Sequence, residues 1–129
     1  MPLMKIDMLT GRSEDQIKQI LDISYQVMLK AFDAPVGDRY QIVTQHAPYE
    51  MQILDTGLNI PRTDQVLIFS LVTRPRTEAQ KGSFYHDLVT ALHDELGLAP
   101  TDVMINLSVN TDADWSFGNG EAQFLTGKL

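Results

Sequence analysis

The sequence predicts an α/β (α+β) fold in which a strand–helix–strand unit is used twice. Three observations predict it: two similar helix-start motifs, a strand pattern on either side of each helix, and a length of 129 residues, which suits a single domain. With 43% hydrophobic and 21% charged residues, the chain can bury a core and has neither a disordered nor a low-complexity composition.

The first unit covers residues 2–45. Residues 2–9 form a short apolar run in which Lys5 and Asp7 alternate with the apolar residues 4, 6 and 8, which is the period of a strand. Ser13 and Gln16 form a capping box, and apolar residues at helical spacing behind it predict a helix of about five turns. An Ala-Pro pair ends that helix, because the residue before proline disfavours the helical conformation, and residues 40–44 form a second strand.

The second unit covers residues 65–109 and repeats this order. An uninterrupted apolar run at 66–72 predicts a strand that is buried on both faces. Thr77 begins another capping box, the amphipathic helix behind it ends at Gly97, and residues 103–109 form the last strand.

The two units match each other in order and spacing. Segment 12–16 reads Arg-Ser-Glu-x-Gln, segment 76–80 reads Arg-Thr-Glu-x-Gln, and an Ala-Pro pair with Asp38 corresponds to one with Asp102, at an offset of 64 to 65 residues. Capping boxes, breaks and strands in the same order indicate an internal repeat. The rest of the chain is a connection at residues 46–64 and an aromatic tail at residues 110–129.

Charge and composition exclude several classes of function. Ten Lys and Arg against seventeen Asp and Glu give a net charge of −7, which argues against binding to a nucleic-acid backbone. The absence of cysteine excludes disulfides, thiolate nucleophiles and cysteine zinc sites. Lys5 and Asp7 interrupt the first apolar run, and no stretch approaches the roughly 20 residues that span a bilayer, so we expect a cytoplasmic protein without membrane contact.

Metal and cofactor sites are not expected. The tail has oxygen ligands at calcium-loop spacing from Asn110 to Glu121, but Trp115 stands where that loop requires glycine. His86 and His93 lie on one predicted helix with no third ligand nearby in the sequence. No glycine-rich phosphate loop is present, so the sequence predicts no cofactor.

Pro2 is the first candidate catalytic residue. The initiator methionine is normally removed when the next residue is small, which would expose a secondary amine at Pro2. Such an amine can act as a base when desolvation lowers its pKa, or as an acid when it stays protonated. The alternative is structural, because proline at the start of an edge strand leaves the hydrogen-bond ladder intact.

Arg74 and Arg76 are candidates for binding a carboxylate or a phosphate. In an extended chain, residues two apart point to the same side, about 6.5–7 Å from each other, and Pro75 favours that extended state. Two guanidinium groups on one side form a clamp for an oxyanion. Arg76 directly precedes a predicted helix start, where the helix dipole disfavours a positive charge, and a bound anion would offset that cost. Alternatively, both arginines are solvated charges at a strand–helix junction.

Asp38 and the aromatic tail each allow two interpretations. Asp38 is either a carboxylate for acid–base or water-activating chemistry or a turn residue before a strand, and its repeat partner favours the turn. Trp115, Phe117, Phe124 and Leu129 are either ordinary core residues or an apolar lid over a pocket.

In combination, these residues resemble the tautomerase superfamily. The resemblance comes from Pro2 at the start of a strand, two strand–helix–strand units in 129 residues, and Arg74-Pro75-Arg76 after the third strand. It covers essentially the whole chain. The segments most similar to the malonate semialdehyde decarboxylases are Asp38-Arg39-Tyr40-Gln41, Asp55-Thr56-Gly57-Leu58 and Asp112-Ala113-Asp114-Trp115-Ser116-Phe117-Gly118.

The resemblance implies a homotrimer in which each subunit has a four-stranded sheet with two helices on one face. It also implies roles for the candidate residues: Pro2 would be the catalytic amine, and Asp38 its carboxylate partner. Arg74 and Arg76 would hold the substrate carboxylate. An apolar wall would be formed by Trp115, Phe117, Phe124 and Leu129.

The implied activity is that of a cofactor-independent enzyme. We expect a decarboxylase that converts malonate semialdehyde, a small 3-oxo acid, to acetaldehyde and CO2, with a protonated or iminium-forming Pro2 that stabilises the enolate. One alternative is a keto–enol tautomerase of phenylpyruvate-like acids, which requires a neutral Pro2 amine. Another is a noncatalytic trimeric module that binds a ligand. The expected partners are a small carboxylate and further copies of the chain.

Overall fold

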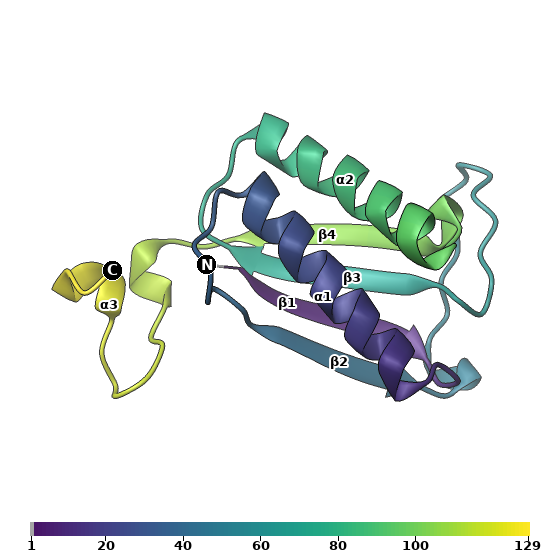
Figure 1. The fold of residues 1–129 in the computed structure, drawn as a ribbon, viewed down its shortest axis with the longest axis horizontal. Helices are drawn as coiled ribbons and strands as arrows, with labels where there is room; N and C mark the ends of the chain where they lie inside the picture. The colour runs from purple at the N-terminus through teal and green to yellow at the C-terminus, as the bar shows by residue number, and fades with distance from the viewer. Residues whose placement is uncertain (1) are drawn as a thin grey trace.

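Four strands and three α-helices make up the described part of the chain, residues 2–129 of a computed structural model (Figure 1). Met1, whose removal is predicted above, lies outside the described residues. The strands are β1 (Leu3–Leu9), β2 (Gln41–His46), β3 (Leu67–Thr73) and β4 (Val103–Val109), and the helices are α1 (Glu14–Ala31), α2 (Glu78–Leu96) and α3 (Gln123–Thr126).

The strands form one mixed sheet in the order β2–β1–β3–β4. β1 is parallel to β2, β3 is parallel to β4, and β1 and β3 are antiparallel. Each parallel pair belongs to one strand–helix–strand unit, so the two repeated units meet along β1 and β3. The predicted four-stranded sheet is confirmed. β2 covers Gln41–His46, so it begins and ends slightly later in the chain than the predicted strand at residues 40–44.

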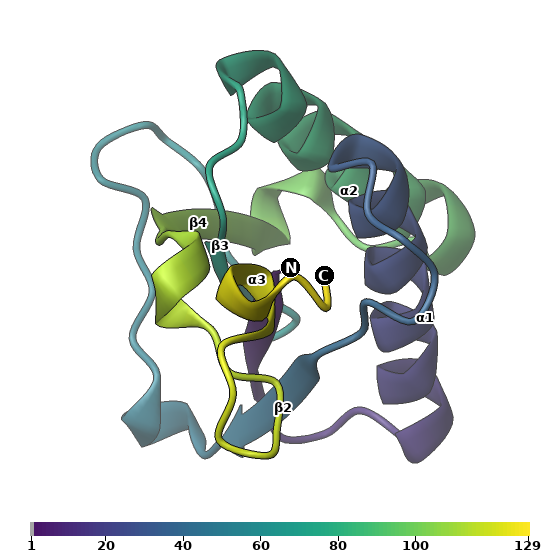
Figure 2. The same ribbon diagram turned by 90° about the vertical axis from the view of Figure 1, so that its left-hand side faces the viewer.

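α1 and α2 lie side by side on one face of the sheet (Figures 1 and 2). Both predicted capping boxes are present: the hydroxyls of Ser13 and Thr77 each accept a hydrogen bond from the third amide of the helix. α2 ends at Gly97, as predicted. This glycine adopts the left-handed conformation typical of a helix C-cap, with φ 69°. No helix of the described residues is long and apolar enough to cross a membrane.

The core fills the space between these two helices and the sheet. Phe32 at the end of α1 and Phe84 of α2 contact each other with ring centroids 5.0 Å apart, which joins the two units. The other large, fully buried side chains are Met4, Ile6, Met8, Ile20, Leu67, Phe69, Leu71, Leu88 and Leu92.

Among the described residues, no helix covers the opposite face of the sheet (Figures 1 and 2). Because side chains alternate along a strand, the residues between the buried ones of β1 and β3 point to this face. Two of the apolar residues on it, Ile42 and Met104, are 50% and 42% exposed. A broad, partly apolar face of this kind is suited to contact with another molecule.

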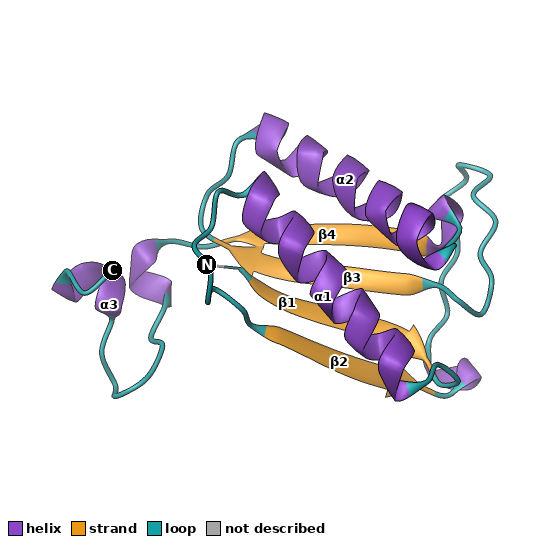
Figure 3. Ribbon diagram, in the orientation of Figure 1, coloured by secondary structure: helices purple, strands orange, loops and turns teal. Residues whose placement is uncertain are grey.

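The tail, residues 110–129, stands beyond the end of the sheet at which β1 begins (Figures 1 and 2). It consists of a single helical turn, Asp112–Asp114, a loop, and the short helix α3 (Figure 3). α3 is a third helix that the sequence pattern does not predict, because its four residues are too few to give a helical periodicity.

Candidate active site

Pro2 is buried at the end of the sheet where β1 begins. The pairing of β1 with β2 and with β3, continued to this residue, brings it between Arg39 and Thr73. The main chain of Pro2 therefore lies beside two segments: the loop that carries Asp38, and the end of β3 that leads into the two predicted arginines.

Asp38 lies on the loop between α1 and β2 and has only 3% of its surface exposed. The Gly37 amide beside it donates a hydrogen bond of 2.9 Å to the Tyr25 hydroxyl of α1, which holds this loop. Burial raises the pKa of the Asp38 carboxyl, and nearby positive charges, including those of Arg76 and Arg74, oppose the rise. A poorly solvated carboxylate next to cationic groups suits proton transfer better than it suits a surface turn.

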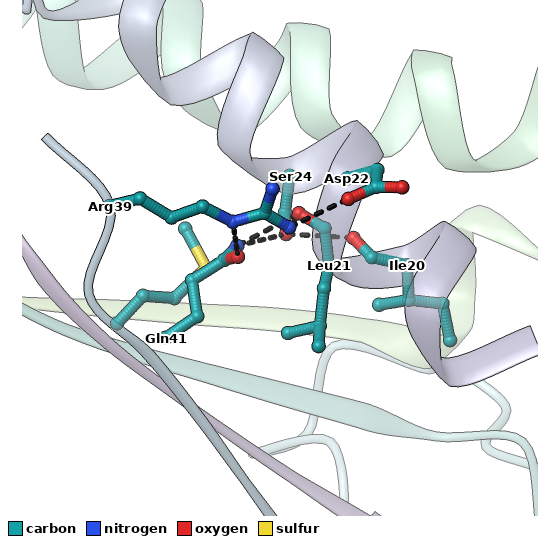
Figure 4. Close-up of polar contacts among 7 residues, drawn as sticks. Ile20, Leu21, Asp22, Ser24, Arg39 and Gln41 are labelled. Carbon is teal, nitrogen blue, oxygen red and sulfur yellow. Dashed lines mark hydrogen bonds and ion pairs between the residues drawn. The ribbon is translucent and has the colours of Figure 1, made fainter. Parts of the chain in front are cut away.

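Arg39, the neighbour of Asp38, secures the same loop against α1 (Figure 4). Its Nε donates to the Gln41 amide oxygen at 2.9 Å, and its Nη2 donates to the Asp22 carboxylate at 2.7 Å. Its guanidinium carbon lies 4.7 Å from the centroid of the Tyr25 ring. Arg39 therefore fixes the start of β2 and, with it, the position of the Asp38 loop.

Arg76 is anchored to the body of the protein. Its Nε donates to the Thr73 hydroxyl at 3.1 Å, its Nη1 donates to the Phe32 carbonyl at 2.9 Å, and its guanidinium carbon lies 5.0 Å from the centroid of the Phe32 ring. Burial and the charge of Arg74 lower the pKa of Arg76, while Asp38 raises it. Because Nε and Nη1 of Arg76 are hydrogen-bonded within the protein, the orientation of its third nitrogen, Nη2, is also fixed.

Arg74 is held by the tail instead. Its Nε donates to the Asp112 carboxylate at 2.7 Å, and its guanidinium carbon lies 4.0 Å from the centroid of the Phe124 ring. Each of the two arginines therefore has specific partners within the chain, in addition to any contact with solvent. The two arginines stand two residues apart, and the charge of Arg74 is one of the causes that lower the pKa of Arg76.

An aromatic cluster connects the tail to the end of the sheet. Trp115 stacks on Phe117 with centroids 5.4 Å apart, and Phe117 meets Phe124 edge-on at 5.5 Å. Phe117 also stacks on Tyr40, which directly precedes β2, at 5.6 Å. The Trp115 indole N–H donates to the Asn110 side chain at 2.7 Å. Phe124 of this cluster lies against Arg74, and the rings together form an apolar surface at the same end of the sheet as Pro2.

Leu129 contributes less to this surface than predicted. It is 60% exposed at the end of the chain, and its amide donates to the Gln123 carbonyl of α3. Conversely, Tyr40 and Asp112 join the site although neither is among the predicted site residues. Both stand in segments that carry the family resemblance, which is the signal that could have found them.

A second Arg–Asp corner lies at the opposite end of the sheet. In the repeat, Arg12 corresponds to Arg76 and Asp102 corresponds to Asp38. The position that corresponds to Pro2 is a valine, Val66. Asp102 accepts hydrogen bonds from the Thr63 amide at 2.7 Å and the Thr63 hydroxyl at 2.5 Å, while Arg12 donates to the Gln65 carbonyl at 2.5 Å. A surface pocket of about 290 Å³ adjoins this corner. Because the connection occupies its Arg–Asp pair and no proline amine is present, this corner does not reproduce the candidate site.

Comparison with known proteins identifies the family. A family model described as "Tautomerase enzyme" matches residues 38–118. This chain belongs to the tautomerase family. The tautomerase chain is 46% identical over 129 residues to the probable tautomerase YrdN of Bacillus subtilis (strain 168), covering 100% of both chains. It is 34% identical over 126 residues to the probable tautomerase YusQ of the same organism, covering 97% of this chain and 99% of the other.

Solved structures extend this result. A malonate semialdehyde decarboxylase studied for its decarboxylase and hydratase activities matches this tautomerase at 48% identity and a TM-score of 0.96, covering 98% of both chains. An FG41 malonate semialdehyde decarboxylase inhibited by 3-bromopropiolate matches at 34% identity and 0.93, covering 98% of this chain and 97% of the other. A fused 4-OT protein, a symmetric trimer, shares the fold at 17% identity and 0.78, covering 97% and 98%. The predicted tautomerase fold is confirmed, and the protein is a member of a family of enzymes.

Proposed function

We propose that this tautomerase-family enzyme is a cofactor-independent decarboxylase of a small 3-oxo acid, and that it converts malonate semialdehyde to acetaldehyde and CO2. One observation carries the proposal: a buried proline, a buried carboxylate and two separately anchored arginines lie at the same end of the sheet. The likeness to two malonate semialdehyde decarboxylases supports this choice of substrate.

The arginines bind the substrate in this proposal. Arg76 is fixed by the core and Arg74 by the tail, so two directed positive charges are available to the carboxylate of a short acid. Removal of Met1 gives Pro2 a secondary amine. A three-carbon acid held by its carboxylate then presents its aldehyde oxygen to that amine.

The chemical step breaks the bond between the carboxylate carbon and the adjacent CH2. The bonding electrons move to the aldehyde oxygen, CO2 leaves as a neutral molecule, and the resulting enolate takes a proton on carbon to give acetaldehyde. A protonated Pro2 amine, kept cationic by Asp38, donates a hydrogen bond to the oxygen on which negative charge develops. Alternatively, the neutral Pro2 amine adds to the aldehyde carbon and water leaves, which gives an iminium that accepts the same electrons. The resulting enamine takes a proton on carbon, and hydrolysis releases acetaldehyde and restores the amine.

The aromatic cluster assists the loss of CO2. Phe124 lies against Arg74, and Phe117 and Trp115 extend the apolar surface beside it. An apolar environment favours a neutral product over a carboxylate, so a surface that covers the leaving group promotes its departure.

The test is proton NMR of malonate semialdehyde incubated with the protein and with Pro2→Ala, with intact mass confirming that Met1 has been removed. We expect acetaldehyde to form with the parent protein and the rate to fall by about 10²- to 10⁴-fold in Pro2→Ala, the range for loss of a general acid. No conversion by a chain shown to start at Pro2 would overturn the proposal.

Keto–enol tautomerisation is the second candidate, favoured by the names of the two relatives from Bacillus subtilis. Tautomerisation and the decarboxylation route that uses a protonated amine need opposite protonation states of the Pro2 amine. A base must be neutral, so tautomerase activity would rise with pH through the pKa of the amine, whereas activity that depends on the cation would fall. The pH–rate profiles with phenylpyruvate and malonate semialdehyde distinguish them.

We also propose that the enzyme is a homotrimer. The sheet face without helices carries exposed apolar residues such as Ile42 and Met104, which a second copy would bury. The trimeric assembly of a protein with this fold supports the number of subunits.

A further inference from the structure

We propose that Asp112 is a positioning residue, which holds the guanidinium of Arg74 in the orientation that binds the substrate carboxylate. This inference rests on the proposed function, because it assigns a role to Asp112 only through the use of Arg74 in substrate binding.

The contacts of Arg74 leave only part of its guanidinium available to a ligand. Asp112 accepts from Nε at 2.7 Å, which occupies one edge of the planar group. The Phe124 ring, with its centroid 4.0 Å from the guanidinium carbon, occupies one face. What remains is the end of the fork, Nη1 and Nη2, whose parallel N–H groups match the two oxygens of a carboxylate.

Asp112 is itself held in place. The Asn110 amide donates to the Thr73 carbonyl at 2.8 Å, which ties the start of the tail to the residue before Arg74. The Asp114 carboxylate then accepts from the Thr111 amide at 2.8 Å and the Thr111 hydroxyl at 2.9 Å, which closes the helical turn on which Asp112 lies. The position of Asp112 relative to Arg74 therefore follows from hydrogen bonds of the neighbouring tail residues and does not depend on the ion pair alone.

The two arginines differ in how much they need such a partner. Arg76 is fixed by a hydroxyl and a main-chain carbonyl of the protein body. Both described anchors of Arg74 are tail side chains, and the Arg74 and Asp112 side chains are 37% and 47% exposed. A flexible, half-exposed arginine without Asp112 would sample several rotamers, and a misplacement of about 1 Å can lower a rate by about 10²-fold.

Asp112 could instead act only by reducing the positive charge of the site, and the two roles predict opposite results. If Asp112 merely neutralises charge, its removal leaves a more positive site that binds an anion more tightly. If it orients Arg74, its removal weakens binding. The direction of the change in affinity therefore decides between them.

The experiment uses Asp112→Asn, Arg74→Ala and the double variant, with Glu121→Gln as the matched control. Glu121 forms another ion pair of the tail, with Lys128, and does not contact Arg74. KM and kcat are measured with malonate semialdehyde. Malonate, a three-carbon dicarboxylate, is titrated separately by fluorescence of Trp115, the one tryptophan of the chain, which lies in the aromatic cluster.

We expect Asp112→Asn to raise KM and the Kd of malonate about tenfold, with a smaller change in kcat, because it misplaces a substrate-binding group. In the Arg74→Ala background the same substitution should have no further effect, since Asp112 acts through Arg74. Glu121→Gln should match the parent protein, and thermal melting should show that all variants are folded.

Unchanged or lower values of KM and Kd in Asp112→Asn would overturn the proposal, as would an undiminished effect of that substitution in Arg74→Ala. The malonate titration separates this inference from the proposed function. If the parent protein binds malonate but does not decarboxylate malonate semialdehyde, the proposed function fails and Asp112 is still tested. If the parent protein does not bind malonate, the arginine clamp and this inference both fail.

Discussion

At the scale of single residues, the same residue type at equivalent positions of the two repeated units has different contacts and a different proposed role. Asp38 and Asp102 are 3% and 2% exposed. Asp102 accepts two hydrogen bonds from Thr63 and is the turn residue that the repeat predicts. Asp38 instead lies near Arg76 and Arg74, with its pKa raised by burial. The identity of the residue and its place in the repeat are the same, so the difference comes from the surroundings.

The raised pKa of Asp38 predicts how stability depends on pH. The folded state binds this proton more tightly than the unfolded state does, so ionisation of Asp38 destabilises the fold as pH rises above the ordinary value of 3.8. Asp38→Asn removes this effect. We expect its Tm to exceed that of the parent protein at pH 7 by roughly 2–4 °C. The advantage should shrink as pH falls toward the ordinary pKa.

Calorimetry from pH 3 to pH 8 checks this prediction, alongside the decarboxylation assay. A parent protein more stable than Asp38→Asn at pH 7 would contradict it. The same substitution should lower the rate of decarboxylation by about 10²-fold or more, because a neutral amide cannot keep the Pro2 amine cationic.

The repeat supplies a matched pair of arginines for a second prediction. Arg76→Ala removes a group at the candidate site, whereas Arg12→Ala removes the equivalent arginine at the second Arg–Asp corner, which lies at the opposite end of the sheet. We expect kcat/KM to fall by about 10²-fold in the first and to stay within about twofold in the second. Both variants lose a hydrogen bond to a main-chain carbonyl, so both should show a lower Tm. Equal losses of activity would show that the two corners are not functionally different.

At the scale of elements, the tail carries an aromatic cluster outside the main core, and this cluster contacts Arg74. Phe117 is its centre, because it contacts Tyr40, Trp115 and Phe124. The buried core between α1, α2 and the sheet contains no tail residue. Loosening the tail should therefore affect the site more than it affects the stability of the whole fold.

Phe117→Ala tests this separation. Each aromatic contact contributes about 0.5–1.5 kcal/mol, so their loss should release Trp115 and Phe124 and, through Phe124, Arg74. We expect Trp115 emission to move to longer wavelength and KM to rise, while Tm falls by less than roughly 4 °C. The control is Leu125→Ala, because Leu125 lies in the same tail and is 63% exposed. An unchanged Trp115 spectrum in Phe117→Ala would rule out the stacked cluster in solution.

At the scale of the whole molecule, the sheet has one face covered by helices and one that a further subunit can cover. Sedimentation should give a species of three times the chain mass of 14.5 kDa. Ile42→Lys places a charge on the open face, where Ile42 is 50% exposed, and should shift this species toward the monomer without unfolding it. Gln26→Lys on the exposed side of α1 is the control. A trimer that persists in Ile42→Lys would place the interface elsewhere.

The sequence by itself determined the order of the four strands and the two long helices, the two capping boxes, the end of α2 at Gly97 and the existence of a repeat. The strands, helices and caps depend on residues within about four positions of each other, or on a period of about 2 or 3.6 residues, so the local pattern contains them. The repeat is found by comparing such local patterns at an offset of 64 to 65 residues. The resemblance further predicted Pro2, Asp38 and the two arginines as the site.

Only the tertiary structure decided which residues contact each corner of the repeat and how the arginines are held. Arg74 and Asp112 are 38 residues apart, Arg76 and Phe32 are 44 apart, and Thr63 and Asp102 are 39 apart. No local pattern describes contacts at such separations. They exist because the antiparallel meeting of β1 and β3 places the ends of both units, the connection and the tail at defined corners of one sheet.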